Sequence, residues 1–304
     1  MTSNLPLQNT PIPTAQNYVF PRNRLRLSQN DPSRKPLVLI ACGSYSPVTH
    51  LHLRMFEMAS DFVRFNTDFE LLGGYFSPVS DSYKKAGLAN SVDRYVVLPS
   101  LYVLKLTLQR LRMCELAVED STWLMVDSWE AVQPKYMPTA LVLDHFDHEI
   151  NDVLGGAERP DGTRVRVRIS LLAGADLVQT MSTPVWSQDD LDHILRRYGA
   201  FIVERSGTDI DEALAHLQPY KDQIYVIQQL IQNDISSTKI RLFLRREMSV
   251  QYLLPSRVIE YIYQHGLYEE DPSLSVGGKN KAKGSETPGR ASPAPEASSS
   301  SAKS

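Results

Sequence analysis

The feature that most constrains the fold is an alternation of apolar runs of strand length with segments of helical period. The first run, PLVLIAC at 36–42, is typical of a buried parallel strand, and Leu51, Met55, Met58 and Phe62 then recur at helical spacing. Further runs of strand length lie at 70–76, 123–127, 165–174, 199–205 and 223–228. Strands that alternate with helices predict an α/β fold, a doubly wound parallel sheet with right-handed crossovers and helices on both faces.

The two ends of the chain differ in composition from its middle. Residues 1–35 mix Pro, Asn, Gln and Arg without periodicity, and residues 271–304 consist almost wholly of Pro, Gly, Ser, Ala and charged residues. Because neither segment can bury enough apolar surface to offset its ordering entropy, we expect two disordered tails around one domain at 36–270. Within that domain, the polar stretch at 144–162 predicts a long, mobile surface loop.

Charge and composition limit the partners and the compartment. The net charge of -3 and the isoelectric point near 6.2 give no general electrostatic reason to bind nucleic acid or an anionic membrane. Cys42 and Cys114 have no paired spacing, which disfavours a disulfide framework or a Cys-based zinc site. No window approaches the roughly 18–20 apolar residues of a spanning helix, and the N-terminus lacks a signal pattern. We therefore expect an intracellular protein, cytoplasmic or nuclear.

The loop that follows the first strand has the composition of a phosphate-binding loop. Gly43, Ser44 and Tyr45 follow the strand directly, and His52 lies one turn inside the next helix. Ligands of a doubly wound sheet bind at the carboxyl ends of its strands, where a helix N-terminus presents free N–H groups to a phosphate. A Gly beside a small hydroxyl residue permits close backbone approach, and His52 can donate to a phosphate oxygen. The alternative is a plain strand-to-helix turn with incidental histidines.

A second candidate phosphate loop opens the helical run at 240–246. Its residues combine polar and N-cap side chains with two cations: Asn233, Ser236, Ser237, Thr238, Lys239 and Arg241. The helix macrodipole disfavours positive charge at a helix start unless an anion is bound, so Lys239 and Arg241 point to a triphosphate. The alternative is an exposed helix with an ordinary cap.

Together, these two loops resemble the signature loops of the nucleotidyltransferase superfamily. The closer resemblance is to the eukaryotic, fungal-like nicotinamide mononucleotide adenylyltransferases. It is carried, in the family's order, by GSYSPVTHLHLRMFEMA, SPVSDSYKKAGL, VDSWEA, LLAGADLVQTM, VERSG, NDISSTKIR and YLLPSRVIEYIYQHGLY, which cover most of 36–270. The resemblance implies a Rossmann-like nucleotidyltransferase fold. It also implies transfer of AMP from ATP to nicotinamide mononucleotide, and to nicotinic acid mononucleotide, giving NAD or deamido-NAD and pyrophosphate.

The resemblance also implies roles for individual residues. The ATP site would comprise Gly43, Ser44, Tyr45, His52, Gly174, Asp176, Arg205, Asn233, Ser236, Ser237, Thr238, Lys239 and Arg241. The mononucleotide site would comprise Ser44, Tyr45, Lys85, Trp129, Tyr136, Thr139 and Trp186. His52, Lys85, Lys239 and Arg241 would align and stabilise the reacting phosphates. Mg²⁺ would accompany ATP with few protein ligands, which the sequence does not locate, and a homo-oligomer is left open.

Several of these residues have a simpler interpretation. Trp129 follows a strand and could pack in the core, Asp176 could cap the next helix, and Lys85 could be solvated surface charge. Four side chains have the composition of a metal site: Asp144, His145, Asp147 and His148. Because they lie outside the matched motifs, we expect no metal site there. Other superfamily activities, such as adenylylation of FMN or cytidylylation, and an inactive binding protein are the competing functions.

One segment interrupts the resemblance. Residues 95–110 (YVVLPSLYVLKLTLQR) intervene where relatives run directly into a segment like LRMCELA, and removing them puts Arg94 where Arg110 now stands. Pro99 lies inside what should be a helix, where it would remove a hydrogen bond and clash with the preceding turn. We hypothesise that the segment is a translated short intron or a misplaced exon boundary. Sequencing the spliced transcript tests this, and a mature message that encodes the segment would contradict it.

Overall fold

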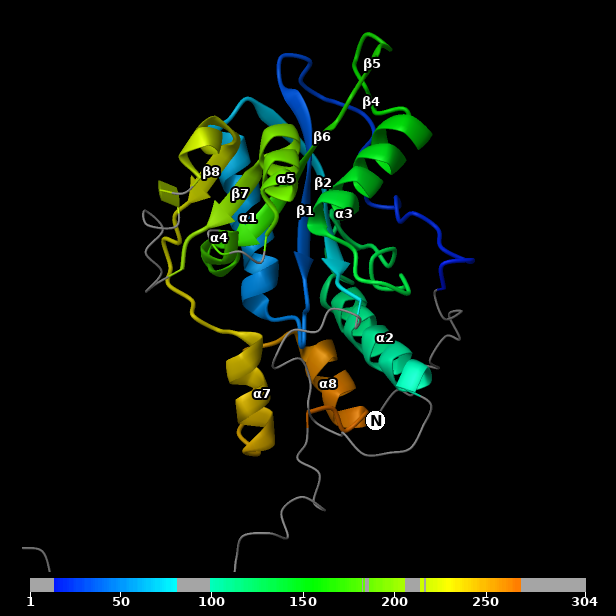
Figure 1. Cartoon of the computed structure of the whole chain (residues 1–304), viewed down its shortest axis with the longest axis vertical. Helices are drawn as coiled ribbons and strands as arrows, with labels where there is room; N and C mark the ends of the chain where they lie inside the picture. The colour runs from blue at the N-terminus through cyan, green and yellow to red at the C-terminus, as the bar shows by residue number, and fades with distance from the viewer. Residues whose placement is uncertain are drawn as a thin grey trace, which may run out of the picture. The chain divides into compact units, whose positions relative to one another are not determined.

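A parallel β-sheet forms the centre of this chain in the computed structural model (Figure 1). The structure describes residues 14–80, 99–181, 183, 186–205, 214–215 and 217–268, without the side chains of 99–106. The strands are β1 (Lys35–Gly43), β2 (Phe69–Pro78), β3 (Leu124–Val126), β6 (Arg168–Gly174), β7 (Ala200–Val203) and β8 (Ile224–Ile227). They lie in the order β3-β2-β1-β6-β7-β8, and each neighbouring pair is parallel. The strand order reverses direction at β1, which confirms the doubly wound sheet expected from the sequence.

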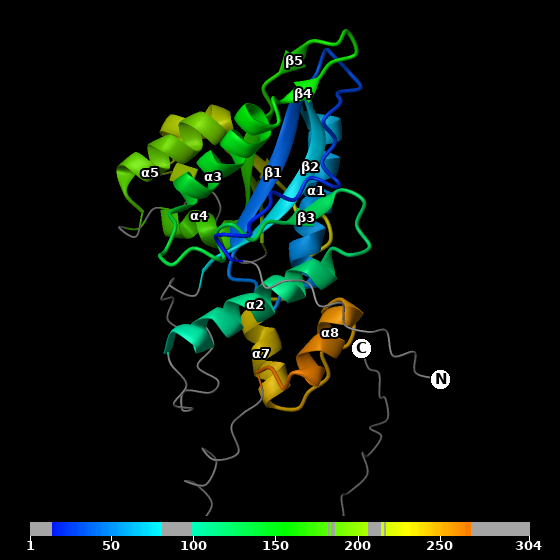
Figure 2. The ribbon, with the colours of Figure 1, turned by 90° about the vertical axis from the view of Figure 1, so that its right-hand side faces the viewer.

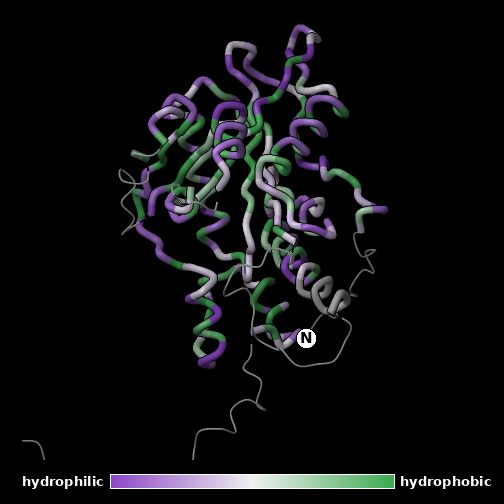
Figure 3. The backbone as a smooth tube through the Cα atoms, viewed as in Figure 1, coloured by the Kyte–Doolittle hydropathy of each residue, from purple (hydrophilic) through white to green (hydrophobic). Residues whose placement is uncertain are grey.

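Helices cover both faces of the sheet, as Figures 1 and 2 show. Val38 and Ile40 point to one face, whereas Leu37 and Leu39 point to the other, so β1 is apolar on both sides. The first face is covered by α3 (Thr139–Asp147), α4 (Ala175–Met181), α5 (Gln188–Asp192) and the π-helix η2 (His193–Tyr198). The second face is covered by α1 (His50–Asn66). Figure 3 shows the hydrophobic strands at the centre between helices of mixed hydropathy.

Three further helices lie beyond the carboxyl ends of the strands in both views (Figures 1 and 2). They are α2 (Pro99–Ala117), α7 (Ser237–Arg245) and α8 (Ser256–Gln264). The hairpin of β4 (Ala157–Glu158) and β5 (Arg164–Val165) lies at the opposite end of the strands (Figures 1 and 2). The helices η1 (His148–Val153) and η3 (Gln218–Gln223) complete the described helices. No helix among the described residues is long and apolar enough to cross a membrane.

The expectation that residues 1–35 form a disordered tail is wrong for residues 14–35. Phe20 and Leu25 are buried in the core on the α3 side of the sheet, with exposed fractions of 9% and 8%. The backbone N–H of Arg26 donates to the carbonyl of Leu72 at 3.0 Å, which ties the segment to β2. Periodicity missed this segment because it is irregular and its contacts come from the rest of the domain. The tail expected at 271–304 lies outside the described residues.

The expectation of a mobile loop at 144–162 is also wrong. The chain continues from α3 through η1 to β4, with Phe146 and Ile150 fully buried. The side chain of Asn151 donates to the carboxylate of Asp147 at 2.7 Å and to the carbonyl of Val167 at 2.9 Å. The polar composition therefore reflects side chains that bond to one another and to neighbouring strands, not a solvated loop.

The expected conflict at Pro99 is wrong as well, since Pro99 is the first residue of α2 and not an interior one. A proline at the first helical position loses no hydrogen bond, because that N–H has no partner within the helix. Residues 99–110 therefore form the first part of the helix that continues to Ala117.

Candidate active site

The first loop is shaped by the side chain of Tyr45. Tyr45 has a positive φ of 45° and is buried, and its hydroxyl donates to the carbonyl of Ala41 at 2.7 Å. A Cβ atom at Gly43 would lie 2.9 Å from the Tyr45 ring, so only glycine leaves room for this packing. The Tyr45 ring thus packs under the loop against Gly43, which leaves the backbone of Tyr45 rather than its side chain to contact a ligand.

His52 is held in one orientation by the start of α1. The backbone N–H of Thr49 donates to Nδ1 of His52 at 2.9 Å, which forms a capping box with the Thr49 hydroxyl. Because Nδ1 accepts this bond, the neutral imidazole carries its proton on Nε2. Burial, and secondarily the charge of Arg205, lowers the pKa of His52 to about 4, so the ring is a neutral donor near pH 7.

The second loop docks onto the first. The side chain of Ser236 caps α7 by accepting from the N–H of Lys239 at 3.2 Å, as the sequence predicts for this helix start. The hydroxyl of Ser237 donates to the carbonyl of Pro47 at 2.8 Å. The guanidinium of Arg241 donates to the carbonyl of Ser46 at 2.6 Å. These two bonds bring the two candidate phosphate loops together.

A pocket of about 510 Å³ lies between the loops, at the carboxyl ends of β1, β6 and β7. Its lining includes Gly43, Ser44, Tyr45, His52, Gly174, Asp176, Arg205, Ser236, Ser237, Thr238 and Arg241. The guanidinium of Arg205 bridges two parts of the rim, because it donates to the carboxylate of Asp176 at 2.5 Å and to the carbonyl of Asp234 at 2.8 Å. A Cβ at Gly174 would meet only the tip of Met55, at 3.9 Å, so the wall there is open to a ligand.

Two members of the expected ATP set are not among the residues that line the pocket. The ammonium of Lys239 is half-exposed and pairs with the carboxylate of Asp234. The side-chain oxygen of Asn233 accepts from the N–H of Ile235 at 3.0 Å and so shapes the loop that leads to α7.

The chain is similar to known proteins over most of its length. A family model described as cytidylyltransferase-like matches residues 107–243. The nicotinamide/nicotinic acid mononucleotide adenylyltransferase of Oryza sativa subsp. japonica is 34% identical over 265 residues, which cover 86% of this chain and 94% of that protein. The chain belongs to the nicotinamide/nicotinic acid mononucleotide adenylyltransferase family.

Fungal members of this adenylyltransferase family are more similar in sequence. Adenylyltransferase 1 of Saccharomyces cerevisiae is 53% identical over 275 residues, and the Schizosaccharomyces pombe protein is 53% identical over 258 residues. These alignments cover 88% and 83% of this chain. The chain spans 65% and 66% of the lengths of those two relatives.

The residues that family resemblance assigns to the mononucleotide are more dispersed than the ATP set. Trp129 is partly buried and stacks on His145, with ring centroids 4.2 Å apart and an interplanar angle of 5°. Tyr136 is 43% exposed, and Thr139 is the first residue of α3. None of these three is among the residues that line the 510 Å³ pocket.

Of the other members of the mononucleotide set, Ser44 and Tyr45 line the pocket. Trp186 lies beside the pocket, because its Nε1–H donates at 3.0 Å to the hydroxyl of Thr180, which lines the pocket. Lys85 lies outside the described residues, so its role in this chain remains a prediction.

A buried polar group beside these aromatic residues was missed by sequence reasoning. Asp127 and Glu130 are 0% and 2% exposed, although both are acidic. The hydroxyl of Tyr18 donates to Asp127 at 2.8 Å and lies 2.9 Å from Nε2 of His145. The hydroxyl of Ser77 donates to Glu130 at 2.5 Å. The available signal was the position of Asp127 directly after β3, with Glu130 three residues further on, at the carboxyl edge where ligands bind.

Arg110 was also missed as a structural residue of the site. It is 4% exposed, and its guanidinium donates to the carbonyls of Ser44 at 2.8 Å and Val79 at 2.7 Å. Arg110 therefore supports the first candidate phosphate loop from α2. No sequence signal identified it, because the carbonyl groups that it meets belong to distant segments.

Proposed function

We propose that this chain transfers AMP from ATP to nicotinamide mononucleotide, and to nicotinic acid mononucleotide, releasing pyrophosphate. The observation that carries the proposal is the docking of the two loops, in which Arg241 and Ser237 bond to the carbonyls of Ser46 and Pro47. It places an α1 N-terminus, His52 and Arg241 around one pocket, a set of donors suited to a triphosphate. Family membership supports the choice of mononucleotide.

The proposed reaction needs no protein nucleophile. A 5′-phosphate oxygen of the mononucleotide attacks the α-phosphorus of ATP, and a new P–O bond forms as the bond to the α–β bridging oxygen breaks. Pyrophosphate leaves with that electron pair. Catalysis of such a transfer consists mainly of aligning two anions and stabilising charge on the transferring and leaving oxygens.

The residues are assigned roles by charge and position. We assign the α-phosphate to the amides near Ser44 and to Nε2–H of His52, and the pyrophosphate to Lys239 and Arg241. We assign the incoming phosphate to Lys85, as the family resemblance implies. The nicotinamide ring would lie against aromatic side chains near Trp129, Tyr136, Thr139 and Trp186.

Mg²⁺ is proposed to enter with ATP rather than to occupy a protein cage. Among the described residues, no group of three His, Cys, Asp or Glu side chains is placed to hold a metal ion. Asp176, which lines the pocket, is engaged by Arg205. Such a donor set fits an ion held chiefly by phosphate oxygens and water, and the ion would neutralise phosphate charge.

A substrate panel tests this function. Purified chain is incubated with Mg²⁺ and each pairing of ATP or CTP with nicotinamide mononucleotide, nicotinic acid mononucleotide or FMN, and the products are separated by chromatography. We expect NAD and deamido-NAD from ATP. A folded protein that makes neither product, or that prefers CTP or FMN, would overturn the proposal.

A further inference from the structure

A second cavity of about 500 Å³ lies at the amino edge of the sheet. It is lined by the starts of three strands, at Lys35 of β1, Phe69 of β2 and Arg168 of β6. The active-site pocket is lined instead by the ends of β1 and β6, at Gly43 and Gly174. Because β1 and β6 run from one site to the other, the two cavities lie at opposite edges of the sheet.

The lining of this amino-edge cavity is strongly cationic. Its described charged residues are the cations Lys35, Arg159, Arg166, Arg168 and Arg197 and the single acid Asp147. A cavity with one dominant sign of charge and walls of low polarity concentrates counter-ions. The chain as a whole has a net charge of -3, so the cationic lining is a local feature.

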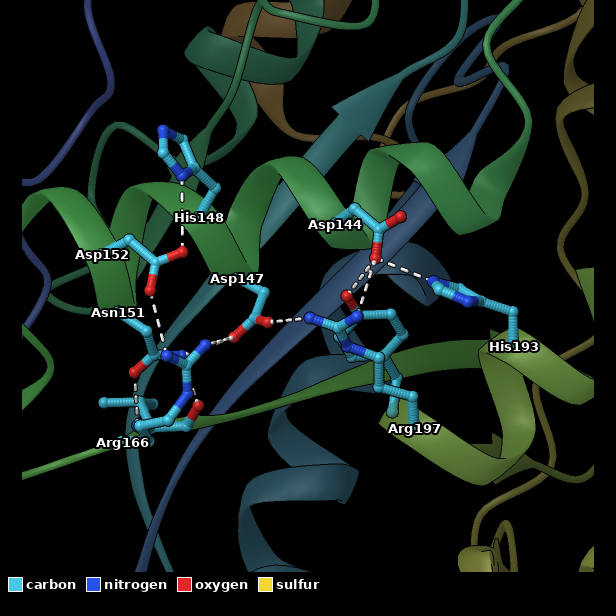
Figure 4. A network of polar contacts seen from close by, with 10 residues as sticks. Asp144, Asp147, His148, Asn151, Asp152, Arg166, His193 and Arg197 are labelled. Atoms are coloured by element: carbon cyan, nitrogen blue, oxygen red, sulfur yellow. Dashed lines mark hydrogen bonds and ion pairs between the residues drawn. The ribbon is translucent and has the colours of Figure 1, made fainter.

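Carboxylates neutralise part of this charge. Asp147 lies between two guanidinium groups, at 3.0 Å from Arg166 and 2.6 Å from Arg197 (Figure 4). Arg166 also pairs with Asp152 at 2.9 Å. Outside the lining, Asp144 lies 3.9 Å from Arg197 and Asp68 lies 2.8 Å from Lys35.

Arg159 and Arg168 differ from the other three cations of the lining, because no carboxylate pairs with either among the described residues. The Nε atoms of both are buried and have no hydrogen-bond acceptor in the described part of the chain. The Arg168 guanidinium lies over the Phe69 ring at 5.6 Å and donates to the side chain of Gln223 at 2.5 Å. Burial lowers the pKa of Arg168 below its ordinary value and outweighs the opposing influence of Tyr225 and Asp68.

We propose that the amino-edge cavity is a binding site for a compact anion with two or more phosphate groups. Guanidinium forks match phosphate oxygens in shape and charge, and the described residues place no carboxylate within ion-pair distance of Arg159 or Arg168. The cavity volume is within the range of about 300–1,000 Å³ that is usual for small-molecule sites. A ligand there does not compete with ATP, because it lies at the other edge of the sheet. This inference does not rest on the proposed function.

Calorimetric titration with inorganic tripolyphosphate tests the site on the full chain. Arg241→Gln is included in every protein to weaken binding at the carboxyl edge. In that background, we expect one tripolyphosphate site whose affinity falls about tenfold or more on adding Arg159→Gln and Arg168→Gln, because each removes charge-assisted hydrogen bonds. Arg22→Gln with Arg112→Gln is the matched control, because it removes equal charge from residues that line neither cavity.

Two results would overturn the proposal. One is the absence of a tripolyphosphate site in the Arg241→Gln background, and the other is equal affinity in the test and control proteins. Arg168 has packing contacts, so the double variant is first checked by circular dichroism. If it does not fold, Arg159→Gln alone carries the test, because its guanidinium makes no described hydrogen bond, and unchanged affinity would then overturn the site.

Discussion

At the scale of single residues, His52 has the most specific expected role. Its Nδ1 accepts from Thr49, which leaves the Nε2 proton for a substrate phosphate. We expect His52→Ala to lower kcat for NAD formation by about 10²–10³-fold, the effect of losing a donor to an oxygen that gains charge. Steady-state kinetics measure this. The control is His50→Ala, since His50 is an exposed residue of the same helix turn. Equal losses in both variants would contradict the role.

We expect Glu130 to give the stability of the protein an unusual dependence on pH. Burial raises its pKa to about 8 from 4.5, with the hydrogen bond from Ser77 acting in the opposite direction. Between pH 4.5 and about 8, Glu130 holds a proton in the folded state that it has lost in the unfolded state. The free energy of unfolding therefore falls as pH rises through this window. We expect Glu130→Gln to remove this fall. Melting temperatures at pH 6 and 8.5 should then differ by about 5 °C less than in the unmodified chain.

The control for this measurement is Glu260→Gln, at an exposed glutamate of α8. The control should retain the full decline in melting temperature between pH 6 and 8.5. A decline that is the same in the Glu130→Gln protein would show that Glu130 is ionised in the folded state.

The sequence predicts some residues of the candidate site but not those that only tertiary packing brings to it. The composition of the two loops at the carboxyl edge predicts His52 and Arg241, the family resemblance implies Gly174 and Arg205, and all four line one pocket. Their roles stay predictions. Tyr18 could not be foreseen, because the carboxylate of Asp127 that it meets is distant in sequence and tertiary packing alone brings the two together.

At the scale of elements, the segment at 14–35 connects the start of the chain to the site. We expect Tyr18→Phe to lower the free energy of unfolding by about 1–3 kcal/mol, because the buried carboxylate of Asp127 loses a donor. It should also raise KM for nicotinamide mononucleotide several-fold without changing KM for ATP, since Trp129 stacks on the adjacent His145. Urea unfolding and steady-state kinetics measure the two effects.

Tyr75→Phe is the matched control for this segment. It removes a hydroxyl that donates to the carbonyl of Pro21 at 2.8 Å, and so loosens the same segment without touching Asp127. The prediction for Tyr18 fails if both variants change KM for the mononucleotide equally.

The sequence predicts the strands of the sheet but not the structure of several segments between them. All six apolar runs of strand length became strands of the sheet, because burial on both faces makes such strands continuously apolar. The polar composition of 144–162 predicts a loop, and the prediction is wrong because its charged residues find their partners in other elements. Asp147, for example, pairs with Arg166 and Arg197. Composition identifies an element that buries its own apolar face, but not one held by contacts from elsewhere.

At the scale of the whole molecule, α2 contains most of the segment 95–110, which interrupts the family resemblance, and contacts the candidate active site. Arg110 is the last residue of 95–110, and it bonds to the loop carbonyl of Ser44 from a buried position. The sequence allows an equivalent arrangement without the segment, because its removal places Arg94 directly before Leu111. The guanidinium of Arg94 would then replace that of Arg110 before Leu111.

We therefore expect the chain without residues 95–110 to fold, to melt no lower than the full chain, and to form NAD at least as fast. The matched control is the same deletion with Arg94→Ala, which loses both carbonyl contacts and should be less stable by about 2–4 kcal/mol, since two buried carbonyls lose charged donors. Thermal melts and initial rates compare the three proteins. If the shortened chain aggregates while the full chain folds and works, the fold requires residues 95–110, and the hypothesis of a translated intron is wrong.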